Sequence, residues 1–271
     1  MIRTIRIFAL LLLSAVPANA LSQEITEENF NNTVAGVLND YAEKIQALYG
    51  SLGNDPNSLT AARVQADKRM YQNLFDTSIK FISLPEALNL AYNIRIHIPK
   101  DSLRSLLDSL PDDKKYSEYG KNIQMHIDTE QIKEGDRFSD FEATGSDGNK
   151  FTLSELDGKN VLLLYGGLDC MGESGREYLK KLYGSTSKET FVIVVYVPVA
   201  DPEKMKEYND DFPSDYIVVS DFLLDSSPIK IKYGAQSTPT CFFINNNGIV
   251  DFISVGLPMS ELNRLLDAKQ L

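Results

Sequence analysis

The chain has 271 residues, with 27 Lys and Arg against 38 Asp and Glu, and a formal net charge of −11 at pH 7. Such an acidic chain lacks the basic face that contact with phosphate groups needs, so we expect neither nucleic acid nor an anionic membrane surface as a partner. The length allows one large or two modest domains, and the two cysteines exclude a small disulfide-framework protein.

The first twenty residues have the pattern of a secretory signal peptide. Arg3 and Arg6 precede an apolar run over 7–16, and Ala-Asn-Ala at 18–20 is a small-residue cleavage site. The run is short for a membrane span, although an uncleaved anchor is the alternative. After residue 20 the chain keeps 25 basic and 38 acidic side chains, a formal charge of −13. We expect export to the periplasm, with no stable membrane span after cleavage.

Residues 21–132 are expected to form an all-α domain, because apolar side chains recur there every three or four positions. The pattern predicts five helices, at 30–48, 59–82, 85–96, 103–110 and 112–127. Apolar and polar residues alternate at 94–98, so a short strand is an alternative at that place. This domain is a candidate surface for a protein partner or for self-association.

From about residue 132 the pattern changes to alternating strands and helices. Buried strands, helices and a closing hairpin are predicted, the strands at 161–165, 191–199, 216–219, 240–244 and 249–255, and the helices at 178–183, 201–212 and 260–271. The piece at 226–233 is expected to be short and helical or irregular. Asp147 and Gly148 signal an earlier hairpin. The alternation of strands with helices implies parallel strands joined by crossover helices, and the last hairpin adds an antiparallel edge. A mixed sheet flanked by helices is therefore expected.

The stretch VLLLYGGLDCMGESGREYLKKLYG, residues 161–184, places Cys170 where a buried strand passes into a helix. A helix N-terminus stabilises a thiolate through its dipole and free backbone N–H groups. Position i+3, where a second cysteine would lie one helical turn further on, is Glu173. Downstream, Thr238 and Pro239 directly precede the apolar run that contains Cys241.

These motifs resemble the thioredoxin fold, and more narrowly the redoxin branch of exported TlpA/ResA-like thiol-disulfide oxidoreductases and AhpC/TSA proteins. IKEGDRFSDFEATGSDGNKFTLSELDGKNVLLLY is similar to the opening hairpin and central strand of that family, and QSTPTCFFINNNGIV to its cis-proline loop, strand and turn. In DCMGE, Cys170 stands at the first cysteine of WCxxC, but Asp169 and Glu173 replace the tryptophan and the second cysteine. The resemblance covers 133–271 and implies a thioredoxin-like domain there.

The resemblance implies Cys170 as the catalytic residue, with Thr238 and cis-Pro239 docking an extended substrate through backbone pairing. The partners would be protein thiols or disulfides, together with an external thiol reductant, because a resolving cysteine is missing. We expect no cofactor and no metal. His97 and His126 both precede this domain and are too few for a metal site.

Three charged neighbours are candidates for modulating Cys170. Asp169 and Glu173 disfavour its thiolate, whereas Arg176 would favour it if the side chain folds back. Glu173 also has a structural interpretation as the third residue of a capping box, which we favour over proton transfer.

Two other functions stay open beside a monothiol oxidoreductase. One is a redox-inactive thioredoxin-fold binding protein. The other is a peroxide reductase acting through sulfenic acid, although its PxxxTxxC pattern has Leu163 and Gly167 at the key positions. Gly166 and Gly167 could leave an open backbone cradle there. Cys241 is expected to be a buried small hydrophobe, since pairing with Cys170 would need Cα atoms within about 6 Å.

Overall fold

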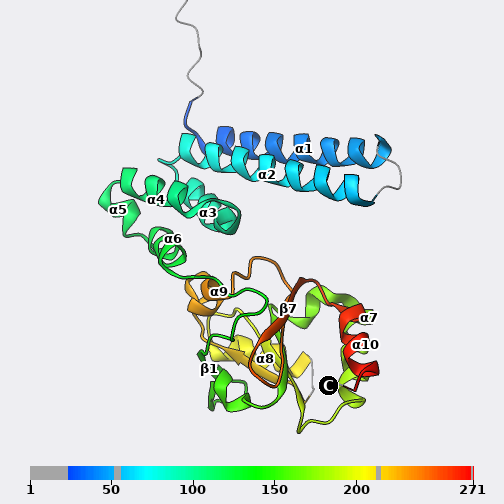
Figure 1. Ribbon diagram of the computed structural model, residues 1–271. Coiled ribbons are helices and arrows are strands. Elements are labelled where there is room, and N and C mark those ends of the chain that lie inside the picture. Colours follow the sequence, from blue (N-terminus) through cyan, green and yellow to red (C-terminus); the bar gives the residue numbers. More distant parts are fainter. Residues whose placement is uncertain (1–23, 52–55, 212–214, 270) are drawn as a thin grey trace, which may run out of the picture.

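The computed structural model describes residues 24–51, 56–211, 215–269 and 271 (Figure 1). At positions 56, 57, 169, 170 and 209–211 the description covers the backbone only. The predicted signal peptide, residues 1–20, lies outside the described residues. In the described part of the chain, no helix combines the length and the apolar character needed to cross a membrane.

Helices make up the first part of the chain, and α1 and α2 lie side by side as a long hairpin (Figure 1). The elements are α1 (Glu27–Ser51), α2 (Pro56–Lys80), α3 (Pro85–Ile94), the 3₁₀ turn η1 (Arg95–His97), α4 (Lys100–Ser109), α5 (Asp112–Lys115) and α6 (Glu118–Asp128). Their common core contains fully buried residues such as Tyr92, Leu103 and Ile123. We call α1 to α6 the helical segment.

Two details of the helical segment differ from the sequence predictions. The strand alternative at 94–98 is wrong, because η1 forms there with Arg95 buried and Ile96 38% exposed. The helix predicted over 112–127 is two helices, α5 and α6. It divides because Ser117 leaves helical geometry and its hydroxyl accepts the Gly120 N–H at 3.3 Å, capping α6.

The second part is a seven-stranded mixed sheet in the order β2-β1-β5-β4-β3-β6-β7. The strands are β1 (Glu142–Gly145), β2 (Lys150–Thr152), β3 (Asn160–Tyr165), β4 (Phe191–Tyr196), β5 (Ile217–Ser220), β6 (Thr240–Ile244) and β7 (Val250–Val255). β3, β4 and β5 are parallel, and β6 runs antiparallel to β3. The predicted mixed sheet is therefore confirmed.

Helices cover both faces of this sheet. The helical elements are η2 (Leu153–Leu156), η3 (Leu168–Met171), α7 (Gly172–Gly184), α8 (Pro202–Asp211), η4 (Leu224–Ser226), α9 (Pro228–Lys232) and α10 (Met259–Asp267). Leu162, Leu164 and Cys241 pack with α7, α8 and α10 on one face. Leu163 and Phe242 pack with α9 and the segment after Ile132 on the other. Each central strand is thus buried on both sides, which explains its continuous apolar sequence.

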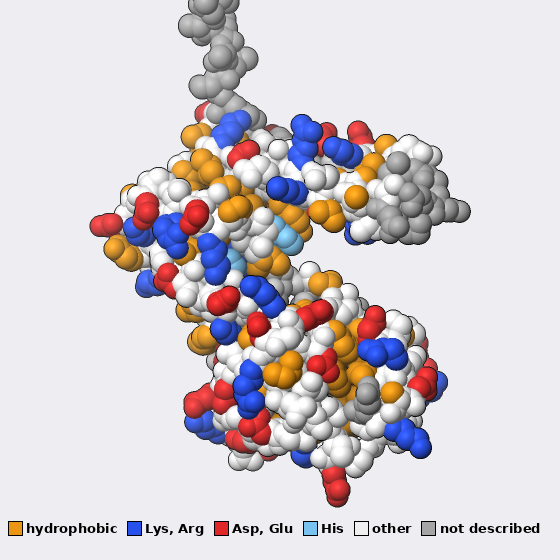
Figure 2. Space-filling view, in the orientation of Figure 1, with side chains coloured by type: hydrophobic (Ala, Val, Ile, Leu, Met, Phe, Trp, Pro, Cys, Tyr) orange, Lys and Arg blue, Asp and Glu red, His pale blue; other side chains and the backbone are white. Residues whose placement is uncertain are grey.

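The helical segment docks on the sheet domain at η4, α9 and the loop before β6. The Tyr92 hydroxyl donates to the Asp225 carbonyl, and Asn122 Nδ2 donates to Ser226 Oγ at 3.2 Å. η4 follows β5, so these contacts lie at the edge where the parallel strands end. Figure 2 shows a hollow between the outer part of the α1–α2 hairpin and the sheet domain.

Candidate functional site

The loop that follows β3 and the loop that precedes β6 lie side by side at the same end of these two strands. β3 ends at Tyr165 and β6 begins at Thr240, and these two residues are paired in the antiparallel register. The chain that continues from Tyr165 toward Cys170 therefore starts beside the chain that arrives from Thr238. The two segments are about 70 positions apart in the sequence, and the pairing of β3 with β6 brings them together.

Gly166 and Thr238 are the point of contact between the two loops. Gly166 has φ +81, a conformation that glycine adopts without steric cost. A Cβ at Gly166 would lie 2.5 Å from Thr238 Cβ and 3.3 Å from Thr238 Cα. Only a glycine allows this approach, so residue 166 permits the Thr238 side chain to lie against the end of β3.

The loop before β6 is held by backbone hydrogen bonds. The Thr238–Pro239 peptide bond is cis, and Pro239 is buried while Thr238 is exposed. The Pro239 carbonyl accepts the Gly256 N–H at 2.9 Å, and Thr240 Oγ1 donates to the Ser237 carbonyl at 2.6 Å. These bonds tie the loop to the end of β7 and leave Thr238 at the surface.

Cys170 lies in η3, between β3 and α7, which is the junction expected from the sequence. Only the backbones of Asp169 and Cys170 belong to the described structure. Glu173 is exposed near the start of α7, and Arg176 is partly buried one turn later. The predicted capping box is wrong, because α7 begins at Gly172 and its N-cap, Met171, has no side-chain cap hydrogen bond.

Tyr208 of α8 covers the backbone just before Cys170. Its hydroxyl accepts the Leu168 N–H, and a Cβ at Gly167 would lie 2.6 Å from Tyr208 Cζ. Thr238 and Tyr208 therefore fill the space beside Gly166 and Gly167. The open backbone cradle considered from the sequence is absent from this part of the described structure.

Cys241 is a free, fully buried thiol on β6. Burial raises the pKa of this thiol to about 12, because the interior disfavours the thiolate. It packs among apolar side chains on the face covered by α7 and α10. The expectation of a buried small hydrophobe agrees with this environment, and a resolving role would need a thiolate that the protein interior suppresses.

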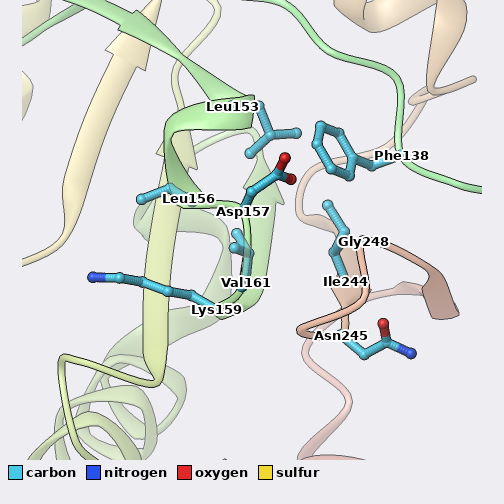
Figure 3. A pocket seen from close by; sticks show the side chains of 10 residues that line it. Phe138, Leu153, Leu156, Asp157, Lys159, Val161, Ile244, Asn245 and Gly248 are labelled. Carbon is cyan, nitrogen blue, oxygen red and sulfur yellow. The ribbon is translucent and has the colours of Figure 1, made fainter.

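Other places are poorer candidates for chemistry. Figure 3 shows a pocket at the start of β3 and the end of β6, lined by apolar side chains such as Leu153 and Val161 and by the polar side chains of Asp157, Lys159 and Asn245. This is the sheet edge opposite Cys170, and the cavity of about 10 Å³ holds at most one water. Among the described residues, no cluster of three or more His, Cys, Asp or Glu could hold a metal ion.

A mixed sheet, a cysteine after its central strand and a Thr-Pro loop beside that junction define a thioredoxin-like domain. Residues 133–266 match the family model described as Redoxin. The C-terminal domain of the chain is therefore redoxin-like, as the sequence motifs predict.

Known proteins resemble the same half of the chain. The Thioredoxin-like protein YneN of Bacillus subtilis is 27% identical over 146 residues, which cover 50% of this chain and 80% of the relative. A thiol-disulfide oxidoreductase from Bacteroides fragilis has 18% identity and a TM-score of 0.43, covering 48% of this chain and 99% of that structure. The thioredoxin domain of a Bacteroides vulgatus thiol-disulfide oxidoreductase has 18% identity and a TM-score of 0.44, covering 52% and 100%.

Three residues around the site could not be recognised from the sequence pattern, namely Tyr208, Gln236 and Arg95. Tyr208 lies on a helix whose polar composition gave no hint of a contact with Leu168. Gln236 lies three residues before Pro239 in the loop, and it accepts a hydrogen bond from Arg95. No signal for the burial of Arg95 is present in the sequence, because Arg95 alternates there with Ile94 and Ile96 as an ordinary polar residue would.

Proposed function

We propose that this protein is an exported thiol-disulfide oxidoreductase in which Cys170 acts as a single catalytic thiol. The observation that carries the proposal is the contact between Gly166 and Thr238. It places the segment leading to Cys170 against the residue before Pro239, so that a substrate held by one loop lies next to the other.

The chemistry needs two external thiols in each cycle. The Cys170 thiolate attacks one sulfur of a substrate disulfide, the S–S bond breaks, and one substrate thiolate leaves and takes up a proton. A reductant thiol then attacks the Cys170 sulfur and releases the second substrate thiol. A second reductant thiol frees Cys170, so that one substrate disulfide is reduced and one disulfide of the reductant forms.

Substrate docking is assigned to Thr238 and Pro239. Thr238 is exposed just before β6, and in this proposal an extended polypeptide docks along this part of the loop. Val255, which pairs with Thr240, is 75% exposed and extends this surface with an apolar side chain. Protein thiols or disulfides are therefore the proposed substrates.

The charged neighbours set the reactivity of Cys170 in this proposal. Asp169 and Glu173 oppose ionisation of the thiol, while the N-terminus of α7 and Arg176 favour it. We propose the chain organisation that accompanies this function as a signal peptide over 1–20, a helical domain over 21–132 and a redoxin domain over 133–271, with the mature protein in the periplasm.

The test measures alkylation of Cys170 between pH 5 and 10 in the folded protein, with Cys170→Ser as control for Cys241. A thiol pKa below the free value of about 8.5, together with glutathione-dependent reduction of a disulfide-linked peptide, supports the proposal. An unreactive Cys170, or reduction that survives in Cys170→Ser, overturns it.

A second candidate is a redox-inactive binding protein. Glu173 at the position of the second cysteine, and the suppressed ionisation of Cys241, favour it. In that case Cys170→Ser keeps both its fold and its partner, and the helical segment carries the binding surface. Loss of partner binding in a folded Cys170→Ser protein would exclude this candidate.

A further inference from the structure

Arg95 of η1 is a buried arginine at the contact between the helical segment and the redoxin domain. Its side chain has no exposed surface. The guanidinium stacks on the Tyr92 ring, with Cζ 4.1 Å from the ring centroid. Nη1 donates to the Tyr92 carbonyl at 2.9 Å and to Gln236 Oε1 at 3.1 Å.

Burying this charged guanidinium costs free energy, which simple packing would not require. Nε and Nη2 have no hydrogen-bond partner in the described structure, and none of the ion pairs between described residues includes Arg95. Desolvation lowers the pKa of the guanidinium. An apolar residue of similar length would fill the same space without burying a charge. The arrangement therefore needs an explanation other than packing.

The contact with Gln236 leads directly to the proposed docking loop. Gln236 begins the segment that continues through Ser237 to Thr238 and Pro239. Its side chain is held at both ends of the amide, because Oε1 accepts from Arg95 while Nε2 donates to the Ala235 carbonyl at 3.0 Å. The guanidinium thus fixes Gln236, and Gln236 fixes the course of the backbone into Thr238.

We propose that Arg95 is a positioning residue for the Thr238–Pro239 loop, so that the helical segment completes the substrate-docking site of the redoxin domain. The inference rests on the proposed function of that loop. It assigns no contact between Arg95 and substrate. Arg95 acts through Gln236, and the effect of removing it falls on substrate binding rather than on the thiol.

The experiment uses the full mature chain and a fluorescent peptide that contains one intramolecular disulfide. We expect Arg95→Met and Gln236→Leu each to raise the KM for this peptide about tenfold, the usual effect of losing a hydrogen bond to a charged group, with kcat within about twofold. The pH profile of Cys170 alkylation stays unchanged. Gln236→Glu keeps the acceptor for Arg95 but loses the amide donor to the Ala235 carbonyl, and its KM stays closer to the wild-type value than that of Gln236→Leu.

Two controls separate positioning from folding. Arg104→Met removes an exposed arginine that is paired with Asp101, and it leaves the KM unchanged. Arg95→Met keeps or raises the unfolding midpoint, since it relieves a buried charge. Unchanged KM values in both Arg95→Met and Gln236→Leu would overturn the inference.

Binding to the inactive protein distinguishes this failure from failure of the oxidoreductase itself. In the Cys170→Ser background, the peptide binds about tenfold more weakly when Arg95→Met or Gln236→Leu is added. If the wild-type protein reduces nothing but this binding difference is present, the redox proposal fails and the role of Arg95 stands. Equal binding in all backgrounds, or no binding in any, refutes the role of Arg95.

Discussion

The Tyr208 hydroxyl accepts a hydrogen bond from the backbone N–H of Leu168, two residues before Cys170. The ring of Tyr208 also lies over Gly167. α8 therefore closes one side of the β3–α7 junction, as Thr238 closes another. The backbone that leads to Cys170 is confined from both sides, and each contact can be tested by substitution.

Tyr208→Phe removes the acceptor and keeps the ring. We expect the free energy of unfolding to fall by about 1 kcal/mol, because the Leu168 N–H loses its partner in a partly buried place. Urea unfolding followed by circular dichroism measures this change. Tyr116→Phe alters a tyrosine that is 62% exposed and should leave the stability unchanged. If both variants lose the same amount of unfolding free energy, the contact with Leu168 does not contribute to stability.

Gly166→Ala tests the approach of Thr238. The new Cβ meets both an unfavourable φ and the Thr238 side chain, so we expect a loss of about 2–4 kcal/mol. Gly148→Ala is the matched control, because Gly148 has the same φ of +81 and no atom within 4 Å of the Cβ position. Its loss should be about 1 kcal/mol. Equal melting temperatures of the two variants would contradict the close packing at Gly166.

Cys241 should be silent toward thiol reagents in the folded protein. Its pKa of about 12 leaves almost no thiolate at pH 8, and the side chain has no exposed surface. Mass spectrometry of Cys170→Ser should show no label after iodoacetamide treatment in buffer and one label in 6 M guanidinium. Rapid labelling without denaturant would show that β6 opens more readily than its central place in the sheet implies.

His126 should make the protein less stable in mild acid. Burial, followed by the nearby charges of Arg95 and Lys100, lowers its pKa from 6.5 to about 4. Between these values the unfolded chain binds a proton that the folded protein does not, so stability falls as the pH falls. The full effect is about 3 kcal/mol. His126→Leu should flatten the change in unfolding free energy between pH 7 and 4, and parallel curves for the two proteins would exclude this origin.

The elements of the redoxin domain could be predicted because each has a local cause. The continuous apolar runs of β3 and β4 follow from burial on both faces of the sheet. Asp201 marks the start of α8, and its carboxylate accepts the Lys204 N–H at 2.9 Å. Turn and cap residues of this kind affect only the few residues next to them in the chain. Their effect can therefore be predicted from the local sequence.

The surroundings of Cys170 could not be predicted in the same way. Whether Gly166 and Gly167 form an open cradle depends on Thr238 and Tyr208, which come from distant parts of the chain. The strand alternative at 94–98 was wrong for a related reason. Apolar and polar residues alternate there, but the contacts of Arg95 with Tyr92 and Gln236 draw the guanidinium inward. Tertiary contacts there outweigh the local pattern.

The buried guanidinium also ties together two parts of the chain that are far apart in the sequence. The Gln236 acceptor lies 141 positions after Arg95. A shortened chain that ends before Gln236 lacks this acceptor, so the dry contact between the Arg95 guanidinium and the loop before β6 cannot form in it. The helical segment and this loop therefore depend on each other for this part of their packing.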